Sequence, residues 1–272
     1  MKLLRLVVLI FLLFSCDDKK ITEINVAEYF KNIQGTAVFF NPAGNEYKIY
    51  NVPLSRKRSS PCSTFKIISS FIALSEQIIT LQNSDMKWNR KTYGYPLWNK
   101  DMNLTEAFKS SCVWYFRALI DKIPPETVEK YLQKYQYGNH DVSDWQGTLN
   151  TNTDQAELKG FWIESSLQIS PVEQVNVLAK IFKGENQITE TLKKIMLVET
   201  SVLKVYGKTG LGIKNNLVQD AWFIGFYERN SQKIFFAVRL ADQENKIEDY
   251  RYQASRYAKS IALDIIQYAA PF

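Results

Sequence analysis

A serine and a lysine stand three residues apart in the stretch SPCSTFKI, which begins at Ser60. Residues at positions i and i+3 of a helix share one face, so the Ser63 hydroxyl and the Lys66 amine can meet. An alcohol becomes a good nucleophile when a neighbouring base removes its proton. A lysine can be that base only when it is uncharged, and its ordinary pKa is about 10.4. Burial among apolar residues such as Phe65 lowers the pKa of an amine, so hydrophobic surroundings are part of this chemistry.

Two further motifs contain residue types that could complete such a site. YGKTGLG places Lys208, Thr209 and Gly210 on a predicted strand, where a lysine and a hydroxyl can bind a carboxylate and a glycine permits close backbone approach. Between the two motifs lies SSCVWYF, with Ser111 at the start of a predicted helix. The order S-x-x-K, S-x-[VN], K-T-G is the signature of serine enzymes that interact with penicillin.

In these strings, and in YGN and FWIESSLQISPVEQ, the chain resembles the class D (oxacillinase-type) serine β-lactamases. The matching strings cover most of residues 60–230 in the expected order and spacing. The resemblance implies that Ser63 is the acylated nucleophile. It also implies that CO2 carboxylates Lys66 to a carbamate, which serves as general base, with no metal and no other cofactor. The fold it implies is the α/β (α+β) serine β-lactamase and transpeptidase-like fold, an antiparallel sheet flanked by helices plus a mainly helical subdomain.

The same resemblance implies roles for the residues around Ser63 and Lys66. Trp162 would donate a hydrogen bond to the carbamate, while Val113 and Phe65 would keep that pocket dry. Ser111 would relay a proton toward the leaving nitrogen. The backbone N–H groups of Ser63 and Leu211 would form the oxyanion hole. The residues that would bind the substrate carboxylate or shape the neighbouring loop are Lys208, Thr209, Gly210, Tyr137, Gly138 and Asn139.

One substrate contact is open from the sequence. Many class D enzymes carry an arginine near the final helix that pairs with the substrate carboxylate, and the candidates here are Arg251, Ser255 and Arg256. The sole histidine, His140, is predicted to be a loop residue rather than a ligand. One histidine cannot build the His-rich zinc site of a metal-dependent β-lactamase.

The surrounding pattern predicts one folded unit in which both ends of the chain contribute to a sheet. Residues 35–51 read as two strands around the turn NPAGN, and a helix follows from Ser63 to about Leu74. Residues 76–202 are mainly helical, with helices opening at Pro125 and after Ser170. KVYGKTG, AWFIGFYE and KIFFAVRLA predict three strands, with RNSQ as a hairpin turn. A helix ends the chain, so the sheet subdomain comprises about 25–75 and 203–272.

The N-terminus predicts export. Lys2 and Arg5 precede an apolar run over residues 6–14, which is too short to span a bilayer but typical of a secretory signal. The following LFSC resembles a bacterial lipobox, which predicts a lipoprotein signal peptide over 1–15 and lipidation of Cys16; the alternative is an ordinary signal cut nearby. Residues 16–24 would be a polar tether and 25–272 the folded domain. We therefore expect a lipid-anchored, periplasmic protein of the bacterial cell envelope.

Composition excludes few partners. The 272 residues carry a formal net charge of +6, and basic residues do not gather in one block, so no nucleic-acid partner is expected. An oxidising location permits a disulfide between Cys62 and Cys112, and two buried free thiols are equally compatible with the sequence. The expected partners are β-lactam antibiotics, and the choice between monomer and homodimer stays open.

The sequence thus supports a β-lactam hydrolase that confers antibiotic resistance through a Ser63 acyl-enzyme. The main alternative is a penicillin-sensing protein that is acylated without fast turnover. A D,D-peptidase shares the three motifs, but STFK, YGN and FWIES argue against it. The substrate range depends on loops near 93–105 and 211–220.

Overall fold

A seven-stranded sheet forms the centre of the computed structural model, which describes residues 19–198, 200, 203–215, 217–241 and 250–272. The strand order is β1-β3-β2-β7-β6-β5-β4. Neighbouring strands run antiparallel except for β1 and β3, which are parallel. The strands are β1 (Lys20–Glu23), β2 (Gly35–Asn41), β3 (Glu46–Tyr50), β4 (Leu197–Val198), β5 (Val205–Lys214), β6 (Leu217–Arg229) and β7 (Gln232–Leu240).

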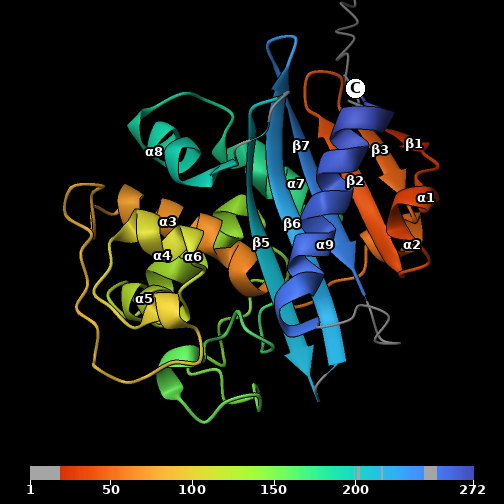
Figure 1. The fold of residues 1–272 in the computed structure, drawn as a ribbon. Coiled ribbons are helices and arrows are strands. Elements are labelled where there is room, and N and C mark those ends of the chain that lie inside the picture. The colour runs from red at the N-terminus through yellow and green to blue at the C-terminus, as the bar shows by residue number, and fades with distance from the viewer. Residues whose placement is uncertain (1–18, 199, 201–202, 216, 242–249) are drawn as a thin grey trace, which may run out of the picture.

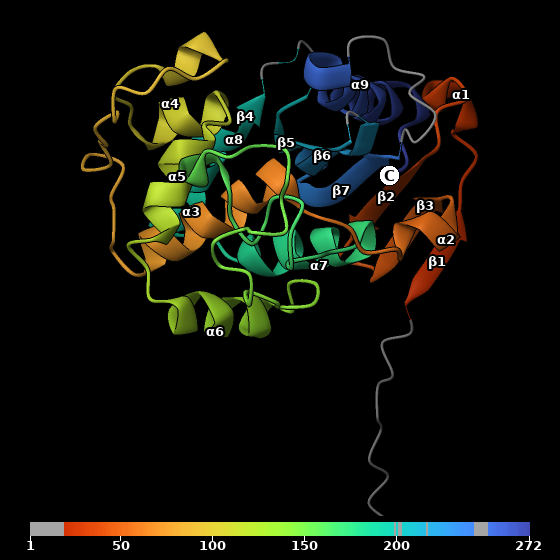
Figure 2. The same ribbon diagram turned by 90° about the horizontal axis from the view of Figure 1, so that it is seen from below.

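Helices cover both faces of this sheet and form a cluster beside it (Figure 1). The C-terminal helix α9 lies on one face and α7 on the other, which gives three layers (Figure 2). The cluster lies on the β5 side of the sheet and contains α3, α4 and α5, with α8 (Figure 1) and α6 (Figure 2) at its outside. The helices are α1 (Ala27–Phe30), α2 (Val52–Ser55), α3 (Lys66–Ser75), α4 (Leu104–Lys109), α5 (Val113–Ile120), α6 (Pro125–Tyr135), α7 (Pro171–Ile181), α8 (Gln187–Met196) and α9 (Tyr250–Asp264).

Two apolar cores explain why the central strands are hydrophobic on both faces. Phe39, Phe223 and Phe236 pack on the α9 side, whereas Phe40, Phe226 and Phe235 belong to the core shared with α7 and the helical cluster. Because successive residues of a strand point to opposite faces, a strand that is covered twice needs apolar residues at nearly every position. β5 lies at the border of sheet and cluster, so residues on it can face the helical cluster.

The structure confirms the fold class and most of the predicted elements. The strands around NPAGN, the three late strands, their turn at Asn230-Ser231 and the final helix all occur where the sequence predicted them. The helix after Ser170 is also present, and a capping box between Ser170 and Glu173 explains where it begins. At its C-terminus, α9 continues as a π-helical turn, Ile265–Ala269.

Three predictions need correction. Lys20–Glu23, expected in a tether, is an edge strand that pairs with β3 through backbone hydrogen bonds. Helix α7, assigned to the helical subdomain, covers the sheet instead, and α3, assigned to the sheet subdomain, packs within the helical cluster. The predicted helix at Ser63 begins as a 3-10 turn, Cys62–Phe65, and becomes α-helical only at Lys66.

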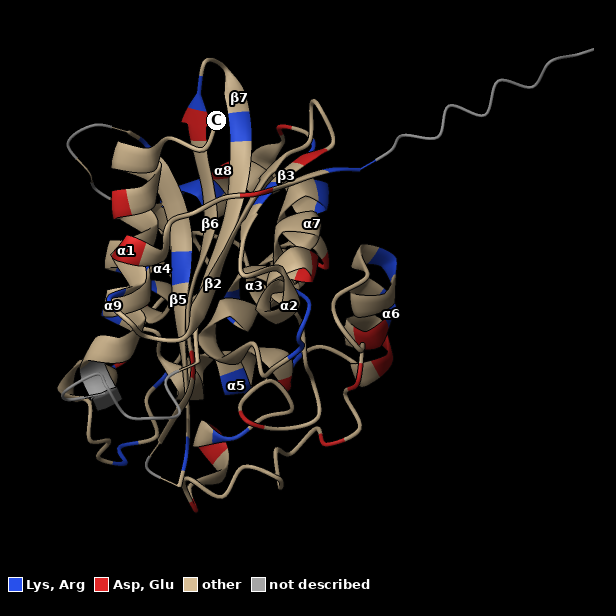
Figure 3. Ribbon diagram, turned by 90° about the vertical axis from the view of Figure 1, so that its right-hand side faces the viewer, with Lys and Arg blue, Asp and Glu red and all other residues tan. Residues whose placement is uncertain are grey.

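Charge is dispersed over the described surface. On α6 the acidic residues lie toward one end and the basic residues toward the other, and most of the sheet carries neither kind (Figure 3). Within the described residues, no helix combines the length and apolar character needed to cross a membrane. The predicted signal peptide and Cys16 lie outside the described residues.

Candidate active site

The turn that precedes α3 brings Ser63 and Lys66 together at the junction of sheet and helical cluster. Lys66 Nζ lies 2.8 Å from Ser63 Oγ, which is within hydrogen-bond distance. Thr64 stabilises the turn because its hydroxyl donates to the Pro61 carbonyl at 2.7 Å. Gln174 on α7 in turn donates to Thr64 Oγ1 at 2.9 Å. The spacing seen in the sequence therefore places the serine hydroxyl and the lysine amine in direct contact.

Lys66 occupies an apolar pocket inside the protein. Its side chain is fully buried, and the ammonium position lies 5.3 Å from the centre of the Phe116 ring on α5. Burial lowers the pKa of Lys66 to about 8, against a weaker opposing effect of Cys112 and Cys62. At that pKa, roughly a tenth of the amine is uncharged at pH 7. The side chain can thus act as a base or react with CO2, as the sequence reasoning required.

Trp162 supplies a hydrogen-bond donor to this region. Its indole stacks on Phe65, the neighbour of Lys66, with ring centroids 5.3 Å apart. The Trp162 Nε1 is buried and has no hydrogen-bond partner among the described residues. Buried donors are nearly always satisfied in native proteins, so an unpartnered one indicates a missing acceptor. A carbamate oxygen on Lys66 fits that requirement.

The YGN segment holds the Trp162 loop in place. Asn139 donates to the Ser166 carbonyl at 2.8 Å and accepts from the Gln168 amide at 2.9 Å. Gly138 has φ +59, and a Cβ there would lie 1.9 Å from Gln168 O, so no other residue fits. Tyr137 packs edge-on against Phe65 at 5.9 Å. The segment therefore shapes the loop beside the site, as predicted, while His140 next to it lies in that loop.

Ser111 and Lys208 meet across the gap between α5 and β5. Lys208 Nζ donates to Ser111 Oγ at 2.5 Å and to the Thr209 carbonyl at 3.1 Å. Burial, and then the charges of Lys66 and Lys259, hold the pKa of Lys208 well below its usual value. A cluster of amines with little negative charge nearby favours an anionic ligand. The structure thus brings the serines and lysines of the three sequence motifs into one connected site.

β5 runs close against the Ser63 turn because of Gly210. A Cβ on this residue would lie 3.0 Å from both the Pro61 carbonyl and the Thr64 methyl group. The approach puts the strand that carries Leu211 beside the turn that carries Ser63, as an oxyanion hole built from both backbone N–H groups requires. The conformations of Cys62 and Ser111, with φ +48 and +57, show that this region also holds non-glycine residues in the left-handed region.

The structure offers a different cation for the open carboxylate contact. Lys259 on α9 lines a cavity of 340 Å³ together with Lys208 and Thr209. Ser255 lies one turn earlier, on the same side of the helix. Arg256 instead lines a separate cavity with Tyr29 and other residues next to α1, so the geometry does not support it as the carboxylate partner. The Arg251 side chain lies outside the described residues.

The two cysteines near the site are free thiols. Cys62 and Cys112 are both buried and are not joined by a disulfide. Burial raises the pKa of Cys112 to about 11 and that of Cys62 well above its usual value. Both side chains are therefore unreactive thiols near neutral pH, and the disulfide that the sequence permitted does not form here.

A group of buried polar residues near the Ser63 turn was not predicted from the sequence. Arg239 on β7 pairs with Asp220 on β6 and also donates to the Lys57 carbonyl at 2.8 Å. The Ser59 hydroxyl donates to Asp220, and Glu164 lies beside Cys62. A charged residue inside the otherwise apolar strand KIFFAVRLA is a signal that could have revealed this group.

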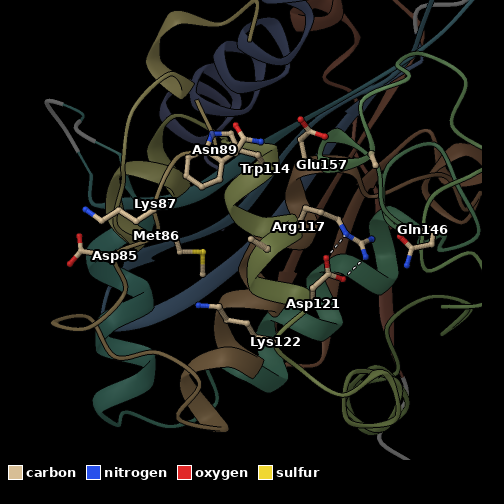
Figure 4. A pocket seen from close by; sticks show the side chains of 12 residues that line it. Asp85, Met86, Lys87, Asn89, Trp114, Arg117, Asp121, Lys122, Gln146 and Glu157 are labelled. Carbon is tan, nitrogen blue, oxygen red and sulfur yellow. Dashed lines mark hydrogen bonds and ion pairs between the residues drawn. The ribbon is translucent and has the colours of Figure 1, made fainter. Parts of the chain in front are cut away.

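A second cavity, of 580 Å³, lies on another side of α5 (Figure 4). Trp114, Arg117, Ala118 and Asp121 form one stripe of the helix along its wall, at spacings of three and four residues. Arg117 is buried and pairs with Asp121 there. Phe116, which faces Lys66, points away from this stripe. The cavity is thus separate from the Ser63 site, with α5 as the partition between them.

Comparisons with known proteins agree with this arrangement. The family "Penicillin binding protein transpeptidase domain" matches residues 32–267. The methicillin resistance mecR1 protein of Staphylococcus aureus is 33% identical over 84% of this chain. That match covers 37% of the mecR1 protein, so the chain spans little more than a third of its length.

Solved structures give the same picture. The C-terminal domain of the Bacillus licheniformis BlaR penicillin-receptor superposes with a TM-score of 0.79 at 32% identity, covering 93% of this chain and 98% of that domain. A class D β-lactamase from Sebaldella termitidis superposes with a TM-score of 0.78 at 27% identity, covering 94% of this chain and all of that one. The receptor domain and the β-lactamase thus have nearly the same TM-score against this chain, while the receptor domain shares more identical residues with it.

Proposed function

The chain belongs to the penicillin-binding protein transpeptidase-domain family and is homologous to class D β-lactamases, and from this premise we propose that it hydrolyses β-lactam antibiotics through a Ser63 acyl-enzyme. The observation that carries the proposal is the contact between Ser63 Oγ and Lys66 Nζ at 2.8 Å in an apolar pocket. Burial keeps part of the amine uncharged, and the uncharged amine is the form that can take up CO2 and become a carbamate base beside the serine.

Acylation would proceed by attack of Ser63 Oγ on the β-lactam carbonyl carbon. The Ser63 proton would pass to the base on Lys66 as the new C–O bond forms, and the N–H groups of Ser63 and Leu211 would stabilise the resulting tetrahedral oxyanion. Collapse of this intermediate would then break the ring C–N bond. Ser111 would relay the proton taken from Ser63 to the departing nitrogen, receiving one proton as it gives up another. Lys208 supports that role because it donates to Ser111 Oγ and leaves the serine hydroxyl proton free for the nitrogen.

Deacylation would use water, which forms a new bond to the acyl carbon as the Ser63 C–O bond breaks and the proton returns to Ser63. A carbamate on Lys66, held by Trp162 Nε1, would supply the general base for both steps. The unpartnered indole N–H of Trp162 and its stacking on Phe65 support this assignment. Opening of the ring would inactivate the antibiotic and so confer resistance.

The second candidate is a penicillin sensor that stays acylated. Its support is the similarity to the mecR1 protein and to the BlaR receptor domain. The same Ser63 chemistry would produce the stable adduct if deacylation were slow. A D,D-peptidase is a third reading, because the matching family is described by a transpeptidase domain.

Turnover distinguishes these candidates. The purified protein would be mixed with a chromogenic cephalosporin at tenfold excess, with and without bicarbonate. Complete consumption of the cephalosporin, accelerated by bicarbonate, supports the hydrolase. Ring opening that stops after one equivalent supports the sensor. Release of D-alanine from a peptide ending in D-Ala-D-Ala would support the peptidase.

We also propose that the protein is lipid-anchored at Cys16 in the bacterial envelope. The basic residues, the apolar run and the LFSC string support this location. Labelling of cells with a radioactive fatty acid should mark the wild-type chain, and Cys16→Ala should abolish the label. An unlabelled wild-type chain would favour the ordinary signal peptide.

A further inference from the structure

A carboxyl group lies directly behind the two backbone segments of the proposed oxyanion hole. Glu164 Oε1 accepts a hydrogen bond from Cys62 Sγ at 3.2 Å, and Cys62 is the residue before Ser63. On the other side, a Cβ at Gly212 would come within 1.9 Å of the same oxygen. Gly212 follows Leu211 on β5. The carboxyl group therefore touches the chain next to both N–H groups that would hold the oxyanion.

Hydrogen bonds fix the backbone from Trp162 to Glu164 against the segment before Ser63. The Glu164 amide donates to Ser60 Oγ at 2.8 Å, and Ser60 Oγ donates to the Trp162 carbonyl at 3.0 Å. The Cys62 amide donates to the same carbonyl at 2.9 Å. Glu164 itself has φ +48, which a non-glycine residue adopts only when its surroundings impose it. These bonds link the Trp162 loop to the nucleophile turn through the Trp162 carbonyl and the Glu164 amide.

Charged groups from three strands face Glu164. The negative charge of Asp220 on β6 raises the pKa of Glu164, whereas the positive charges of Lys214 on β5 and Arg239 on β7 lower it. Burial and the charge of Asp220 raise the pKa of Glu164 to about 7. The hydrogen bond from the Cys62 thiol and the charges of Lys214 and Arg239 act in the opposite direction and lower this pKa. The group can therefore gain or lose a proton within the range in which β-lactams are stable enough to assay.

We propose that Glu164 is a positioning residue that sets the charge behind the oxyanion hole, its neutral form favouring acylation of Ser63 and its ionised form opposing it. The inference rests on the proposed acylation, because the oxyanion develops only when Ser63 attacks a carbonyl. A negative charge close behind the N–H donors weakens their attraction for that oxyanion. In a partly buried site the effect on the acylation rate is on the order of tenfold.

The test compares acylation rates of wild type and Glu164→Gln from pH 5.5 to 9. Glutamine keeps the shape and stays neutral, so it mimics the protonated acid and can still accept from Cys62. The rates are single-turnover rates with a chromogenic cephalosporin in saturating bicarbonate. Lys66 titrates in both proteins, so its effect cancels in the comparison and the difference in rate reports Glu164. We expect equal rates at pH 5.5 and a variant about tenfold faster at pH 8.5, with little change in KM.

Glu157→Gln is the matched control. Glu157 is a half-buried carboxylate that pairs with Lys91 and has a lowered pKa. The ratio of the Glu157→Gln acylation rate to the wild-type rate should therefore not change with pH. Cys62→Ala removes the thiol that donates to Glu164, and it should move the pH transition upward. Equal pH profiles for wild type and Glu164→Gln, with acylation intact, would overturn the inference but not the proposed function.

A second measurement does not depend on activity. Carbon-13 NMR of protein labelled at glutamate carboxyl carbons should show one resonance that titrates near pH 7 and is absent from Glu164→Gln. Titration of that resonance below pH 5 would overturn the inference in any case. Absence of any Ser63 adduct would overturn the proposed function, and this inference with it.

Discussion

The ring of Phe65 stacks on the indole of Trp162, with centroids 5.3 Å apart and planes inclined by 21°. Phe65 separates Thr64 from Lys66 in the sequence, whereas Trp162 is almost a hundred residues away. Phe161 and Tyr137 close the same aromatic group edge-on. The stack attaches the Trp162 loop to the turn of the nucleophile, and it leaves the indole N–H buried without a partner among the described residues.

Trp162→Phe tests whether that N–H supports a carbamate on Lys66. Phenylalanine preserves the stacking on Phe65 but removes the donor. We expect the bicarbonate-dependent part of turnover to fall at least about tenfold, since a charged acceptor loses its hydrogen bond. Carbon-13 NMR with labelled bicarbonate would follow the carbamate signal directly. Trp88→Phe, a change outside the site, should retain the signal; equal signals in all three proteins would contradict the assignment.

Lys66→Ala removes the base beside Ser63. The acylation and deacylation rates should both fall by about 10²- to 10⁴-fold, the usual contribution of a general base. In wild type the rates should rise as the pH increases toward and through about 8, because only the uncharged amine can take up CO2 to form the carbamate. Rapid-quench mass spectrometry of the acyl-enzyme measures both steps. Lys130→Ala on the outer face of α6 is the control, and a wild-type rate that declines over that range would refute the role.

Lys259→Ala tests the cation that lines the cavity with Lys208 and Thr209. Loss of a charged partner for the substrate carboxylate should raise KM roughly tenfold and change kcat little. Arg256→Ala removes a positive charge from the same helix but from a different cavity, so its KM should match wild type. Steady-state kinetics on one penicillin would check both variants. The reverse pattern would restore Arg256 as the carboxylate partner.

Asp220→Asn tests the buried ion pair with Arg239. Both side chains are almost fully buried, so the variant leaves the guanidinium without its counter-ion inside the protein. The free energy of unfolding should fall by about 3–5 kcal/mol, as measured by urea denaturation. The double change Asp220→Leu with Arg239→Met should be less destabilised than the single change, because no uncompensated charge stays buried. A loss below about 1 kcal/mol for Asp220→Asn would show that the pair is not a stabilising unit.

Local pattern was enough to predict most of the fold. Apolar alternation in AWFIGFYE and KIFFAVRLA indicates strands because a pleated chain alternates its faces, and Pro125 marks a helix start because its ring suits the first turn. Lys20–Glu23 was missed because four exposed residues carry no such pattern, and their strand exists only through pairing with β3. The position of α7 on the sheet was not predicted, because an apolar stripe shows that a helix packs against something but does not identify the surface it packs against.

The candidate site divides in the same way. Ser63 and Lys66 were predictable because a single helical turn sets their separation, whatever the rest of the chain does. The contacts of Lys208 with Ser111, of Phe65 with Trp162 and of Glu164 with Cys62 join segments about a hundred residues apart. No local rule relates such segments, because their separation is decided by how sheet and helices pack.

The sequence by itself determined the reacting groups, their order and the apolar character of their surroundings, because these follow from residue type and short spacing. Only the tertiary structure decided that Lys259 rather than Arg256 faces Lys208, that Cys62 and Cys112 stay free thiols, and that Glu164 stands behind the nucleophile turn. The physical reason is that burial and charge act through space, and distances in space are set by the packing of the whole chain.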